Sequence, residues 1–193
     1  PPITCSACKG DLMALSFDGT DDSLTHSGAL FSGSATSYGF TLVAWARPDG
    51  KHEGTIMGAD DGSDDNERFS IFSRTNGRFA LRRKSGYIQT PDEDFGNSNT
   101  TWFHIAGGFS YGVRALYVNG TQEVTQTSNV SLDPTGATTF YIGRDRATGK
   151  FWDGAIAEAA AYSTPLDAAD IISLASGFSP LLVRPDKLIG YWP

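Results

Sequence analysis

The side chains best suited to bind a ligand in this 193-residue chain fall at or beside predicted turns. They are four aromatic residues and two charged residues at a strand end: Tyr38, Tyr87, Tyr111, Trp152, Arg144 and Asp145. Aromatic faces stack on pyranose rings, and arginine and aspartate hydrogen-bond to sugar hydroxyls, so this set predicts a sugar-binding surface. The alternative for each is a position at the rim of the hydrophobic core, because a chain with 12% aromatic residues places several there in any case.

Catalytic patterns are missing from the sequence. Glycan hydrolysis on a β-sandwich uses alternate carboxylates on one strand face as acid and nucleophile, and no such run occurs. The spacing G-x-S-x-G occurs once, at residues 108–112, but it lies between two predicted strands and does not form the strand-to-helix elbow of a serine nucleophile. An H-E-x-x-H motif is absent. His104 shares a predicted strand face with Trp102 and Ala106, and a histidine between core residues favours a structural role. We therefore expect a protein that is not an enzyme.

The two cysteines form a single C-x-x-C pair, Cys5 and Cys8, in a polar arm that begins with proline. A redox site would need a following helix to lower a thiol pKa, and a zinc site would need two further ligands. The sequence shows neither a helix pattern after the two cysteines nor a second pair of metal ligands. The sequence favours ordinary thiols or a local disulfide.

Charge and hydropathy narrow the range of partners. Fifteen lysines and arginines against 22 aspartates and glutamates give a formal charge of -7, which repels phosphate backbones, so we expect no nucleic acid partner. No apolar run approaches the roughly 20 residues that span a bilayer, which argues against membrane insertion. The N-terminus lacks the profile of a signal peptide, so we expect either synthesis without export or prior removal of the signal.

Short runs of alternating apolar residues, separated by clusters of Gly, Asn, Asp and Ser, predict the elements that position these side chains. This pattern is typical of an antiparallel β-sandwich in a single domain. Asn76-Gly77 and Asn119-Gly120 predict type I′ hairpin turns, in which both central residues need positive φ. Strands are predicted at residues 14–19, 40–47, 55–58, 69–74, 79–83, 102–108, 113–118, 140–143 and 154–162.

One short helix is predicted near the C-terminus. Thr164 supplies an N-cap hydroxyl and Pro165 the first helical position, while Gly177 suits the C-terminal cap. The run 188–192 predicts a last strand, either beside residues 14–17 or as part of a following segment. The predicted organisation is an extended arm at 1–12, a globular domain at 13–178 and a tail at 179–193.

Several predicted strands contain short sequence motifs that resemble those of a known family. Two of them are Leu15-Ser16-Phe17-Asp18-Gly19 and the segment Gly154 to Tyr162. The second is similar to G-x-I-D-E-V-x-I-Y of the laminin-G-like (LamG) jelly rolls in the concanavalin A-like lectin/glucanase superfamily. In the order of its motifs the chain resembles this family over about residues 14 to 178. The resemblance implies an all-β fold, a two-sheet antiparallel β-sandwich or jelly roll, with one short helix near the C-terminus.

The resemblance also bears on metal binding. In many relatives, a structural calcium is held by carboxylates near the F-D-G motif and near the strand that corresponds to residues 154–162. The resemblance therefore implies calcium ligands at Asp18, Asp22 and Glu158. This chain has Ala157 where the family has aspartate, and a lost oxygen ligand weakens a site for a cation that takes six to eight. We expect no cofactor, and a structural calcium remains an alternative.

The resemblance implies a non-catalytic surface module on the virion surface or outside the cell. Our main hypothesis at this point is a structural or attachment protein of a phage-like particle, of the capsid decoration or fibre type. Such a protein would bind a particle surface, form a homo-oligomer, most plausibly a trimer, and could also bind glycans. The alternative is a carbohydrate-binding, lectin-like accessory module of a secreted enzyme or adhesin, with a cell-surface glycan as partner.

Overall fold

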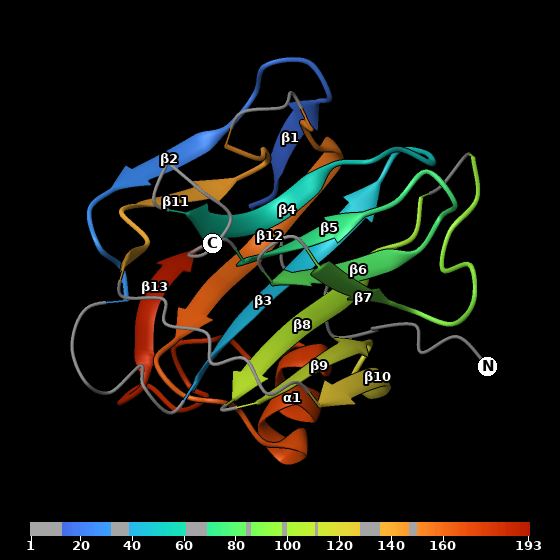
Figure 1. Cartoon of the computed structure of the whole chain (residues 1–193). Coiled ribbons are helices and arrows are strands. Elements are labelled where there is room, and N and C mark those ends of the chain that lie inside the picture. The colour runs from blue at the N-terminus through green and yellow to red at the C-terminus, as the bar shows by residue number, and fades with distance from the viewer. Residues whose placement is uncertain are drawn as a thin grey trace.

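The computed structural model describes residues 13–31, 39–60, 69–83, 86–97, 100–110, 112–127, 136–146 and 150–193. Their strands form two antiparallel sheets that pack face to face (Figure 1). The first sheet has the order β1 (Leu15–Asp18), β12 (Asp153–Tyr162), β3 (Gly39–Pro48), β8 (Phe103–Ser110), β9 (Val113–Val118) and β10 (Thr121–Thr127), and β13 (Leu188–Trp192) pairs with β12. The second sheet has the order β2 (Leu24–Ser27), β11 (Thr139–Ile142), β4 (Thr55–Asp60), β5 (Phe69–Ser73), β6 (Phe79–Arg83) and β7 (Gly86–Gln89).

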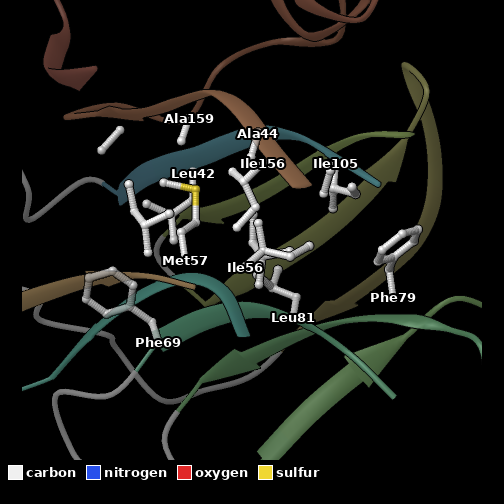
Figure 2. Close-up of a cluster of buried hydrophobic side chains, with 14 of the residues drawn as sticks. Leu42, Ala44, Ile56, Met57, Phe69, Phe79, Leu81, Ile105, Ile156 and Ala159 are labelled. Carbon is white, nitrogen blue, oxygen red and sulfur yellow. The ribbon is translucent and has the colours of Figure 1, made fainter. Parts of the chain in front are cut away.

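The main core fills the space between the two sheets, as Figure 2 shows. Alternate residues of each strand point inward because successive side chains leave a strand on opposite faces. Leu42 and Ala44 of β3 meet Phe69 of β5 and Leu81 of β6 across this layer. The structure therefore confirms the predicted two-sheet sandwich.

A second, smaller cluster lies on the outer face of the first sheet, beneath α1 (Ala168–Ala175). Val43 of β3 and Ala106 of β8 contact the buried helix residues Ile171 and Leu174. This cover explains why both faces of β3 are apolar in sequence. No helix in the described part of the chain has the length and apolar character needed to cross a bilayer.

The helix starts later than the sequence predicts. Its N-cap is Asp167, whose Oδ1 accepts a hydrogen bond from the backbone N–H of Asp170 at 2.9 Å. Thr164 instead precedes the helix, and its carbonyl accepts a hydrogen bond from the Thr41 hydroxyl at 3.0 Å. A tertiary contact of Thr164 with β3 thus displaces the predicted start by one turn. Gly177 follows the helix with a φ of 92°, which confirms the predicted C-terminal cap.

Replacing the true N-cap should weaken the fold measurably. We expect Asp167→Ala to lower the free energy of unfolding by about 1 kcal/mol, because the Asp170 N–H loses its partner. Thr164→Ala is the control and should change stability by less than about 0.5 kcal/mol. Urea denaturation of both variants measures the difference, and a larger loss for Thr164→Ala would contradict the assignment of Asp167 as the cap.

The two predicted hairpin turns differ in the structure. Asn119 and Gly120 both have positive φ, 50° and 83°, and join β9 to β10 as the type I′ prediction requires. Between β5 and β6 only Gly77 has positive φ, so the type I′ prediction is wrong for Asn76-Gly77. The residues of that turn extend over 74–78, and a longer loop does not need two left-handed residues.

The last strand of the chain completes the first sheet. β13 pairs with the C-terminal half of β12, and β1 pairs with its N-terminal half. Both strands lie along the same edge of β12, end to end, because β3 occupies the other edge. The predicted strand at 188–192 is therefore confirmed, but its predicted pairing beside residues 14–17 is wrong, because β13 forms its hydrogen bonds with β12.

Candidate functional site

The outer face of the second sheet presents one continuous row of residues across neighbouring strands. In register, Tyr141 of β11 pairs with Gly58 of β4, Gly58 with Ser70 of β5, Ser70 with Arg82 of β6, and Arg82 with Tyr87 of β7. Most sequence neighbours of these residues lie in the core between the sheets, so the row itself lies on the opposite face of the sheet. Tyr141, Ser70 and Arg82 are each less than one-tenth exposed, whereas Tyr87 is 41% exposed. Large polar or aromatic side chains therefore stand at both ends of the row and the smallest ones in its middle.

Seven side chains on this face form two groups of contacts, one of two residues and one of five, which are joined through the adjacent residues Arg144 and Asp145. We call the whole set the arginine-aromatic strip. Its outer members pair guanidinium groups with rings: the Arg144 guanidinium carbon lies 4.6 Å from the centre of the Tyr141 ring, and that of Arg74 lies 4.6 Å from Tyr87. Cations above aromatic faces are attracted by the ring quadrupole. The strip consists of Tyr141, Arg144, Asp145, Arg82, Phe72, Tyr87 and Arg74.

The centre of the strip is a buried ion pair. Nη1 of Arg82 lies 3.1 Å from Oδ2 of Asp145, and both side chains are less than one-tenth exposed. The Arg82 guanidinium also lies 4.6 Å from the Phe72 ring, whose edge contacts Tyr87 with the ring centres 5.8 Å apart. A buried pair of this kind fixes geometry more than it adds stability, because desolvation offsets its Coulombic gain. The pair joins the segment after β11 to β6 across the sheet face.

A second ion pair lies beside the strip, between Lys150 Nζ and Glu53 Oε1. Burial alone would raise the pKa of Glu53, but the hydrogen bond and charge of Lys150 and the charges of Arg74 and Arg82 hold it below its ordinary value. Glu53 is therefore ionised at neutral pH. A general acid for glycoside hydrolysis needs the opposite, a raised pKa, so Glu53 does not have the properties of that acid.

The structure brings together three of the six residues that the sequence singles out. Tyr87, 41% exposed, lies toward one end of the strip, Arg144 lies at the other end, and Asp145 belongs to the central ion pair. Tyr38 and Tyr111 lie outside the described residues. Trp152 takes the alternative role that the sequence offered, packing in the hydrophobic core. Its side chain is fully buried between the sheets and presents no surface to a ligand.

Sequence reasoning missed the other members of the strip: Phe72, Arg74, Arg82 and Tyr141. A signal was present, since Phe72 and Arg74 alternate with core residues of β5, and Arg82 does so on β6. A large charged or aromatic residue at an outward position of a central strand is the pattern that marks such a face.

Of the three calcium candidates, Asp18 and Asp22 lie close together and Glu158 lies elsewhere. Asp18, Asp21 and Asp22 form one exposed group after β1, with a carboxylate oxygen of each within 4.8 Å of the others. Within the group, Oδ1 of Asp18 accepts hydrogen bonds from the N–H groups of Thr20 and Asp21. Asp18 pairs with Asp153, the first residue of β12. Glu158 lies five residues further along β12, which separates it from the Asp18 group by about 16 Å. Both oxygens of Glu158 instead accept from the Tyr191 hydroxyl at 2.9 Å.

The comparisons with known proteins agree on the fold. The model of a family described as the concanavalin A-like lectin/glucanases superfamily matches residues 18–172. No curated protein matches the sequence.

Solved structures with a similar fold include a heptameric SAP-like pentraxin from Limulus polyphemus, with a TM-score of 0.66 and 20% identity over 86% of this chain and 83% of that chain. A putative carbohydrate-binding protein from Bacteroides ovatus has a TM-score of 0.69 and 17% identity over 94% of this chain, which spans 51% of that protein. The CBM40 of the Ruminococcus gnavus IT-sialidase, bound to α2,3-sialyllactose, has a TM-score of 0.61 and 11% identity over 84% of this chain and 98% of that one. Identities this low show a shared fold.

Proposed function

Because the chain belongs to the concanavalin A-like lectin/glucanase superfamily, we propose that it is a non-catalytic carbohydrate-binding module whose binding surface is the arginine-aromatic strip. The observation that carries this proposal is the set of arginine and aromatic side chains that pair with one another on one outer sheet face. Carbohydrate-binding proteins among the structural neighbours support it.

Each part of the strip has a chemical role in this proposal. The exposed Tyr87 ring offers apolar surface to the C–H face of a pyranose, and the guanidinium groups of Arg74 and Arg144 donate hydrogen bonds to sugar oxygens. The buried pair of Arg82 and Asp145 holds the surface rigid, which lowers the entropy that binding would otherwise cost. Binding on a sheet keeps the contacts aligned along an extended oligosaccharide.

The same observations support a module that binds without catalysis. The two described carboxylates at the strip, Asp145 and Glu53, each have a cationic partner, and Glu53 has a lowered pKa. A module of this type works on extracellular glycans, alone or beside an enzyme domain. The structural comparisons therefore favour this function over our main hypothesis of a particle-surface protein, and the homo-oligomer and trimer remain predictions.

Glycan binding can be tested directly. The full chain should bind members of a glycan array, and Tyr87→Ala should weaken binding of the best one about tenfold or more by calorimetry, because it removes the exposed ring. Phe178→Ala is the matched control: this aromatic residue is 58% exposed after α1, away from the strip, and its loss should leave affinity unchanged. Failure of the wild-type chain to bind any array glycan would overturn the proposal.

A further inference from the structure

Within the described part of the chain, two arginines of the strip lack a carboxylate partner, a property that they share with Arg78, Arg83 and Arg114. They differ from these three in that each stacks on a tyrosine ring. Among the residues that the structure describes, neither Arg74 nor Arg144 forms an ion pair, although the chain carries a net charge of -7. Glu53 lies close enough to Arg74 for its pKa to respond, but its ion-pair partner is Lys150. Cations that do have carboxylate partners are Arg47, Lys51, Arg82, Lys150, Arg184 and Lys187.

Both guanidinium groups are held in place without being neutralised. Each stacks on a tyrosine ring at 4.6 Å and buries its Nε atom, which has no hydrogen-bond partner. In the described structure, their terminal nitrogens make no hydrogen bond and are not enclosed by protein. A guanidinium group with free terminal donors and a fixed plane is suited to a bidentate bond with a carboxylate.

The two groups are also well separated. Tyr141 and Tyr87, which carry them, occupy the same cross-strand row at a distance of four strand spacings, about 19 Å along the sheet. Because each guanidinium lies 4.6 Å from its own tyrosine ring, we expect one carboxylate to contact only one of them. A single ligand reaches both only if it carries acidic groups on separate sugar residues.

We infer that the strip binds an acidic oligosaccharide of the uronate class, with one carboxylate on Arg74 and another on Arg144. The inference rests on the proposed function, since it names the class of glycan for the same surface. The rings of Tyr87 and Tyr141 orient the two arginines, and Arg82 stays paired with Asp145.

The experiment compares hexagalacturonate with the same hexasaccharide after reduction of its carboxyl groups to alcohols. Calorimetry on the full chain should show at least about tenfold tighter binding of the acidic form, a preference that salt weakens. Arg74→Gln and Arg144→Gln should each remove about tenfold of affinity for the acidic form only. The losses should multiply in the double variant, because the sites are far apart.

The control for these variants is Arg47→Gln. The Arg47 guanidinium also lies near an aromatic ring, 5.9 Å from the centre of Trp102, but it has Asp49 as partner on the outer face of the first sheet. Its loss should leave affinity for hexagalacturonate unchanged. The salt dependence of the wild-type chain needs no variant, so it tests the inference even if an arginine variant fails to fold.

The outcomes separate the inference from the proposed function. Equal affinity for both hexasaccharides, or preference for 3′-sialyllactose with its single carboxylate, would overturn the uronate inference and leave carbohydrate binding intact. Binding of neither hexasaccharide, together with no array glycan, would overturn both.

Discussion

Acidification from about pH 6.5 to about pH 3 should remove about 5 kcal/mol of unfolding free energy through His104 alone, because burial lowers the pKa of this residue from 6.5 to about 3. His104 is 1% exposed on β8, edge-on to Trp45 with ring centres 5.5 Å apart, and its Nδ1 has no hydrogen-bond partner. The unfolded chain takes up a proton on this histidine as the pH falls through 6.5, whereas the folded chain does not until about pH 3. Stability is therefore greatest above pH 6.5 and falls throughout that window.

The variant that isolates this effect is His104→Phe, which keeps an aromatic ring against Trp45 and removes the titrating group. Carboxylates also titrate in this range, so the quantity to compare is the difference between the two proteins. Urea denaturation at about pH 7, 6 and 5 should show a steeper loss for the wild type, approaching about 1.4 kcal/mol per pH unit. His26→Phe, at an exposed position on β2, should retain the wild-type slope. Parallel pH profiles for His104→Phe and the wild type would contradict the assignment.

Trp152→Ala should lower the free energy of unfolding by about 3 to 5 kcal/mol, because it removes the largest fully buried side chain of the core. The Trp152 ring packs edge-on against His52 with centres 4.9 Å apart, and its backbone N–H donates to the Gly143 carbonyl at 2.8 Å. Trp152→Phe should cost less, since it keeps most of the volume and removes an Nε1 that has no partner. The denaturation midpoint at constant m-value measures both losses.

Trp102→Ala is the matched control for this cavity, because Trp102 is only partly buried and lies at the rim. Its cost should be well below that of Trp152→Ala. Trp152 was a candidate ligand contact from sequence, so the affinity of the folded variant for a glycan gives a second measurement. If the Trp152→Ala protein had wild-type stability and had lost glycan binding, the assignment of Trp152 to the core would be wrong and Trp152 would be a ligand contact.

The sequence by itself determined the fold class and most of the central strands. Runs such as Phe79–Arg83 and Val113–Val118 match the observed strands, since a strand packed against a core must alternate its side chains. Sequence patterning predicted no range for β2, β7 and β10, which are all edge strands with mostly exposed residues, and only the predicted Asn119-Gly120 hairpin implied β10. An edge strand buries little apolar surface, so pairing with its neighbour decides its structure and its own sequence carries no alternation.

The binding surface was decided only by tertiary structure. Tyr87, Arg144 and Asp145 could be selected from sequence as polar or aromatic residues near turns, yet Trp152 met the same criterion and lies in the core. Arg82 and Asp145 are 63 positions apart, and the order of the strands in the second sheet brings them to 3.1 Å. Local sequence sets which face of a strand a side chain occupies. Strand order sets which distant side chains share that face, because hydrogen bonds between strands that are remote in the chain bring them together.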